Sequence, residues 1–84
     1  MNKLLTAYWI EFGSLYSEQY GVTAYTLDDA KFLLKQKIFI KKEVPSIKNV
    51  IENIQISDLD QNHIVPNIGP IALRGIWFPN FISY

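Results

Sequence analysis

The chain has 84 residues, with eight basic and eight acidic side chains and no cysteine. This length favours one domain with one core, and the apolar share of 49% with an aromatic share of 14% argues against disorder. Zero net charge gives no general attraction to nucleic acid or an anionic membrane, and the lack of cysteine excludes disulfides and thiolate metal sites.

Residues 4–12 alternate as in a strand with two apolar faces. One face carries Leu4, Thr6, Tyr8, Ile10 and Phe12, and the other carries Leu5, Ala7, Trp9 and Glu11. We therefore expect this strand near the middle of a sheet, partly covered on both sides. A loop from Gly13 to Gly21 would join it to a second strand, Val22–Tyr25, in a long hairpin.

Thr26 is the predicted N-cap of a helix over Leu27–Lys37, and Asp28 and Asp29 suit the positive end of its dipole. One stripe of the helix is apolar and would pack on the sheet: Leu27, Ala30, Leu33, Leu34 and Ile38. Phe32 falls outside this stripe, so its ring points elsewhere.

The segment after the helix fits two structures. Its apolar residues match helical spacing over Ile47–Ile54, yet they also fit a strand over Val50–Ile56. We favour the strand, because the apolar residues are all β-branched and no Ala or Leu supports a helix.

The last part of the chain is predicted to be a loop followed by a strand. Residues 57–60 suit a single helical turn, 63–70 read as a loop, and Leu73–Phe78 closes the sheet. Gly75 would mark a bulge or a close backbone approach. The expected fold is α+β: a four-stranded, mostly antiparallel sheet with one helix on one face, in the order β-β-α-β-β. A ferredoxin-like or other α+β arrangement with a second helix is the alternative.

One helix can cover only one face of such a sheet. Trp9, Trp77 and Phe32 therefore need a cover, which residues 80–84 or a second copy of the chain would supply. The loop tyrosines Tyr16 and Tyr20 have the composition of a binding loop, although they would equally well fold back over the open face. These five aromatic residues are the predicted protein-binding set.

A polar cluster offers an alternative site. His63, the only histidine, lies near Asp60 and Asn67, and Arg74 would have to converge on them for a small enzyme. No strained serine elbow, second histidine or glycine-rich phosphate loop accompanies them, so a structural role in the loop is favoured.

Two further motifs are incomplete. Residues 58–62 resemble the start of an EF-hand loop, but His63 and Gly69 stand where glycine and glutamate are needed, so no metal is expected. The segment from Lys35 to Lys42 places four lysines around Phe39, a pattern that suits single-stranded nucleic acid. The neutral charge of the chain argues against nucleic acid as a partner and favours a solvated helix end.

Four blocks of the sequence resemble a group of small uncharacterised bacterial proteins. They are YWIEF (8–12), GVTAYTLDDA (21–30), HIVPNIGP (63–70) and RGIWFP (74–79). The resemblance implies a compact bacterial domain and transfers no activity, and a bias towards Ile and Lys over Arg agrees with such an origin.

The functional prediction is a small non-enzymatic protein-interaction module, such as an adaptor, immunity or antitoxin-like protein. It would bind a protein partner or a second copy of itself, without cofactor, metal or membrane. The lack of cysteine suits the cytoplasm.

Overall fold

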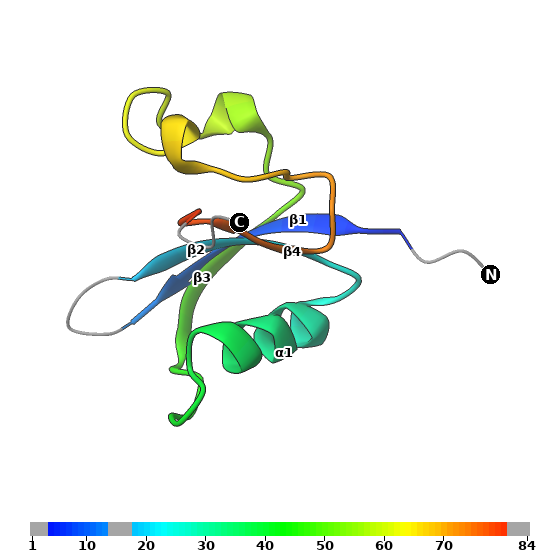
Figure 1. Cartoon of the computed structure of the whole chain (residues 1–84), viewed down its shortest axis with the longest axis vertical. Coiled ribbons are helices and arrows are strands. Elements are labelled where there is room, and N and C mark those ends of the chain that lie inside the picture. Colours follow the sequence, from blue (N-terminus) through cyan, green and yellow to red (C-terminus); the bar gives the residue numbers. More distant parts are fainter. Residues whose placement is uncertain (1–3, 14–17, 81–84) are drawn as a thin grey trace.

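The computed structural model of the chain describes residues 4–13 and 18–80. It has four strands and one α-helix, in the order β1 (Thr6–Phe12), β2 (Gln19–Ala24), α1 (Leu27–Lys37), β3 (Ile47–Glu52) and β4 (Gly75–Phe78). The strands form one sheet in the order β3-β1-β2-β4, and all three pairings are antiparallel. Helix α1 covers one face of the sheet, and the link between β3 and β4 crosses the other (Figure 1). The predicted α+β fold and its element order are confirmed.

Strand β1 lies inside the sheet, between β3 and β2, as its two apolar faces predicted. Tyr8, Ile10 and Phe12 point to the helix side, where they join the larger core cluster. Trp9 and the partly buried Ala7 point to the opposite side and belong to a second cluster. The sheet therefore separates two apolar layers.

Helix α1 has the predicted bounds. The Thr26 hydroxyl accepts a hydrogen bond of 3.0 Å from the backbone N–H of Asp29, which caps the first turn. The buried side of the helix consists of Ala30, Leu33 and Leu34, and Phe32 points away with 53% of its surface exposed. Both predicted ends of the helix are correct, because capping and periodicity are local signals.

Removing this cap should weaken the fold measurably. Thr26→Ala leaves the Asp29 N–H without its side-chain acceptor, and we expect it to lower the free energy of unfolding by about 1 kcal/mol. Thr26→Ser keeps an acceptor and should stay close to the wild type. Urea denaturation followed by circular dichroism measures both; equal losses in the two variants would contradict the capping role.

The segment after the helix is a strand, so the alternative helix over Ile47–Ile54 is wrong. Strand β3 begins three residues earlier than predicted and ends at Glu52 rather than Ile56. It ends there because Asn53 adopts a left-handed backbone with φ 57°, which breaks the strand. Ile54 then turns into the second core cluster.

The second face of the sheet is covered by the chain itself, which corrects the expectation of an open apolar face. The link between β3 and β4 contains two 3₁₀ helices, η1 (Ile56–Asp58) and η2 (Val65–Asn67). Apolar side chains from this link pack over Trp9 and Trp77; they are Ile54, Leu59, Ile64, Val65, Ile68 and Ile71. The sequence did not indicate this cover, because Ile64, Val65 and Ile68 lie in the segment 63–70, whose prolines and glycine predict a loop.

Strand β4 begins at Gly75, two residues later than predicted. Gly75 has φ 149°, a backbone conformation that favours glycine, and the pairing of β2 with β4 shifts register between Gly21 and Val22. The close approach lies at Gly21 rather than Gly75. A β-carbon there would lie 2.4 Å from the Trp77 ring, whereas one on Gly75 would meet nothing within 4 Å.

Candidate functional site

Most of the predicted protein-binding aromatics are not on the surface. Trp9 and Trp77 are buried and pack against each other with ring centroids 6.0 Å apart. Tyr20 is buried between Phe12 and Phe39 in the helix-side core. Three members of the set are thus core residues, because Tyr20 lies on β2 rather than in the predicted loop and packs against Phe39, and the β3–β4 link covers the two tryptophans.

The other two members have different positions. Phe32 is the exposed one, and Tyr16 lies outside the described residues. Burial raises the pKa of the Tyr20 hydroxyl above its ordinary value, and the Glu18 carboxylate 3.4 Å away adds to the shift. Tyr20 therefore acts as a packed and neutral side chain.

The structure brings together three residues of the predicted polar site. The Asp60 carboxylate accepts hydrogen bonds from the backbone N–H groups of Asn62 and His63, at 2.8 and 3.1 Å. It also lies 3.1 Å from Nδ1 of His63, and the Asn67 amide donates to the His63 carbonyl. The His63 side chain is 83% exposed, so these contacts hold a surface loop in shape and form no cleft.

Low pH should break the hydrogen bonds that the Asp60 carboxylate makes in this loop. The backbone N–H of Asn62, and then the contacts with His63, hold the pKa of Asp60 below its ordinary value of 3.8. Because the folded pKa is depressed, the stabilisation is complete above pH 3.8 and is lost as the pH falls through the lower folded value. An NMR titration of the Asp60 carboxyl should show that low midpoint, with the Asn62 and His63 amides shifting at the same pH. A midpoint at or above 3.8 would contradict these bonds.

Arg74 does not join the polar cluster. Its guanidinium makes a two-point contact with the Asp29 carboxylate at the start of α1, including a 2.9 Å bond from Nε, and lies over the Tyr25 ring, 5.8 Å from the ring centre. The hydrogen bond with Asp29 raises the pKa of Arg74 above its ordinary value. Arg74 thus ties the start of β4 to the helix, and the four residues of the enzyme alternative do not converge.

The lysine segment lacks the aromatic surface that nucleic acid would need. Phe39 is buried against Phe12 and Tyr20. The Lys35 ammonium donates to the Lys42 carbonyl and thereby closes the turn after the helix. The segment is a lysine-rich helix end whose aromatic residue belongs to the core.

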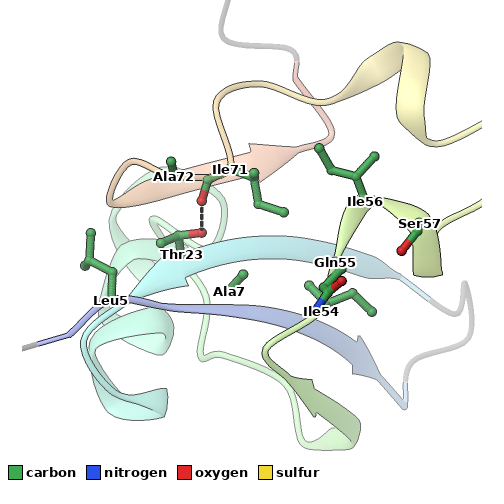
Figure 2. A pocket seen from close by; sticks show the side chains of 9 residues that line it. All are labelled: Leu5, Ala7, Thr23, Ile54, Gln55, Ile56, Ser57, Ile71 and Ala72. Atoms are coloured by element: carbon green, nitrogen blue, oxygen red, sulfur yellow. Dashed lines mark hydrogen bonds between the residues drawn. The ribbon is translucent and has the colours of Figure 1, made fainter.

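An apolar hollow, not foreseen from the sequence, lies on the covered face of the sheet beside the start of β1 (Figure 2). Its volume is about 480 Å³. Ala7 and Thr23 form its floor on β1 and β2, and residues 54–57 and 71–72 form its two walls. The complete lining is Leu5, Ala7, Thr23, Ile54, Gln55, Ile56, Ser57, Ile71 and Ala72.

The hollow exists because a small side chain stands between larger ones. Along this face of the first segment the residues are Leu5, Ala7 and Trp9, so Ala7 leaves space that a larger residue would fill. The Thr23 hydroxyl donates a 2.6 Å hydrogen bond to the Ile71 carbonyl and fixes one wall (Figure 2). The size of Ala7 was the one signal in the sequence that could have indicated this site.

The chemistry of the hollow is that of a binding surface. None of its nine described lining residues is ionisable, and the Thr23 hydroxyl already has its acceptor. Ser57 has no base among these lining residues to activate its hydroxyl. Elsewhere in residues 4–13 and 18–80, no three acidic or histidine side chains gather as a metal site would require.

A second, smaller hollow of about 310 Å³ lies between the end of α1 and β4. Lys37 and Arg74 both line it, but Arg74 is already paired with Asp29. Its lining therefore provides no pair of cations for one ligand.

In comparisons with known proteins, no protein family, no curated protein and no solved structure matches this chain. In the described part of the chain, no helix has the length and apolarity to cross a membrane. Any assignment of function therefore rests on the site itself.

Proposed function

We propose that this chain is a non-enzymatic protein-interaction module that binds an apolar side chain of a protein partner in the hollow over Ala7 and Thr23. The observation that carries this proposal is an exposed apolar hollow whose described lining has no ionisable group. Adaptor, immunity and antitoxin-like proteins act through such contacts, and we place the protein with its partner in the cytoplasm.

The shape of the hollow favours a protein over a small molecule. Sites for small molecules usually enclose most of the ligand. Here the hollow is open, and the rim residues Leu5 and Ile56 are themselves 39% and 42% exposed. An occupant that covers both rim and floor must be wider than one side chain, as a protein segment with an aliphatic or aromatic anchor is.

Variants of the hollow test the proposal on a partner obtained by affinity capture from the source cell. Ala7→Leu fills the floor, and we expect it to weaken binding of that partner at least tenfold, as loss of an anchor pocket does. Ile56→Ser trims the rim and should weaken binding by a smaller factor. Titration calorimetry on the purified pair measures both.

Phe32→Ser is the matched control, because Phe32 is an exposed apolar residue on the helix, outside the hollow. It should bind the partner within about twofold of the wild type. Thermal unfolding of each variant separates lost binding from lost folding. Equal binding by Ala7→Leu and wild type would refute the proposal, as would a chain that binds a small apolar compound and no protein.

A further inference from the structure

The two edges of the sheet differ in the backbone hydrogen bonds around them. At the β4 edge, the Gly69 N–H donates a 2.8 Å hydrogen bond to the Trp77 carbonyl, and the Asn80 N–H donates a 2.9 Å bond to the Asn67 carbonyl. At the other edge, β3 pairs with β1 alone, and within residues 4–13 and 18–80 no other backbone hydrogen bond reaches residues 47–52. The outer side of β3 is therefore an open edge.

Open edges are usually protected by charges, since an unpaired strand can recruit another chain. Strand β3 carries one charge of each sign, Lys48 and Glu52, and both are exposed. Val50 lies midway between them and is half-buried, and Ile51 is an exposed aliphatic residue. In a single copy, these charges discourage pairing with another strand. Two copies of the chain, however, can place each charge opposite the opposite charge of the other copy.

Symmetry limits how two copies of this edge can pair. In an antiparallel pair related by a twofold axis perpendicular to the sheet, the axis passes through one residue that faces its own copy. Centring on Lys48 or on Glu52 would place like charges opposite each other. Centring on Asn49 or Ile51 would leave both charges without an opposite partner.

Centring on Val50 satisfies both charges. Each Lys48 then faces the Glu52 of the other copy, so the dimer contains the pair twice. Val50 faces Val50 on the same side of the sheet, and Asn49 faces Ile51 on the other. This register makes the edge self-complementary in charge and in apolar character.

We infer that a second copy of this chain pairs with the β3 edge, antiparallel and centred on Val50, to give a continuous eight-stranded sheet. Helix α1 packs over β2 and β4, so it lies away from the β3 edge and leaves room for the second copy. The inferred interface is the strand edge and the proposed partner site is the hollow, so either can fail without the other.

A charge exchange tests the register. Lys48→Glu gives an edge with two carboxylates, and Glu52→Lys gives an edge with two ammonium groups. Each variant alone should dimerise at least tenfold more weakly than the wild type, since two attractive pairs become repulsive. An equimolar mixture of the two should form a heterodimer, and the double variant Lys48→Glu/Glu52→Lys should regain the homodimer. Sedimentation equilibrium over a wide concentration range measures all four.

Lys41→Glu is the control, because it makes the same charge change at an exposed residue outside β3 and should leave dimerisation unchanged. Amide hydrogen exchange gives a second readout: alternate amides of residues 47–52 should gain protection as the wild-type concentration rises. A wild type that stays monomeric at millimolar concentration would overturn the inference. The inference would also be overturned if the Lys48→Glu and Glu52→Lys variants dimerised as tightly as the wild type, since the dimer would then use another surface.

Discussion

Gly21→Ala is expected to destabilise the protein by about 3 kcal/mol, the upper end of the usual cost of overpacking a core. The new β-carbon would lie 2.4–2.6 Å from three atoms of the Trp77 ring, which is 1% exposed and so has little room to move. For a domain of this size, such a loss lowers the melting temperature by roughly 15 °C. Thermal and urea unfolding followed by circular dichroism measure it.

Two other glycines are matched controls. A β-carbon on the exposed Gly13 would have its nearest neighbour at 3.7 Å, an ordinary contact, so Gly13→Ala should change stability by less than about 0.5 kcal/mol. Gly75→Ala meets no neighbour but must adopt φ 149°, so we expect an intermediate loss of about 1–3 kcal/mol from backbone strain.

A double variant identifies the cause of the Gly21 effect. If the Trp77 ring is the obstacle, Gly21→Ala should cost far less in a Trp77→Leu background than in the wild type. Losses that simply add would show that residue 21 and residue 77 are not coupled, and would contradict the close approach.

The sequence predicted those elements that local signals define. Helix α1 had the right bounds because Thr26 caps it and its apolar stripe has one period. The inner position of β1 followed from apolar residues on both of its faces, Tyr8 and Ile10 on one and Trp9 on the other. Strand β3 was assigned the right type but extended too far, because Ile54 and Ile56 continue the alternation after Asn53 has turned the backbone.

The sequence could not predict what depends on tertiary placement. Residues 63–70 have the composition of a loop, so the packing of the β3–β4 link over Trp9 and Trp77 was not visible, and those two residues were assigned to a binding surface. Asp60 and His63 meet because a tight loop brings them together. Arg74 lies next to the start of β4, away from that loop, and contacts Asp29 instead.

The candidate site depends on the same placement. The hollow exists because the walls at 54–57 and 71–72 come from two distant stretches of the link between β3 and β4. Neither stretch has a recognisable motif. Only Ala7 carried a sequence signal, and it became meaningful once its neighbours across the hollow were known.

Trp77→Ala is expected to have the largest effect of any single substitution, a loss of about 4 kcal/mol, as for other buried tryptophans. The ring packs against Trp9 and lies over Gly21, and its Nε1–H has no hydrogen-bond partner among the described residues, so apolar contacts hold it. An 84-residue domain has a total stability of about 4–13 kcal/mol, so this loss would remove roughly a third or more of it. Urea denaturation followed by circular dichroism measures the loss.

Phe32→Ala is the control, because Phe32 is an aromatic residue of the same predicted binding set that is 53% exposed. It should change stability by less than about 0.5 kcal/mol. The contrast separates two roles that sequence reasoning had joined, since one aromatic secures the second core layer and the other faces solvent. Equal losses in the two variants would mean that the link does not pack over Trp77, and that face would again be open to a partner.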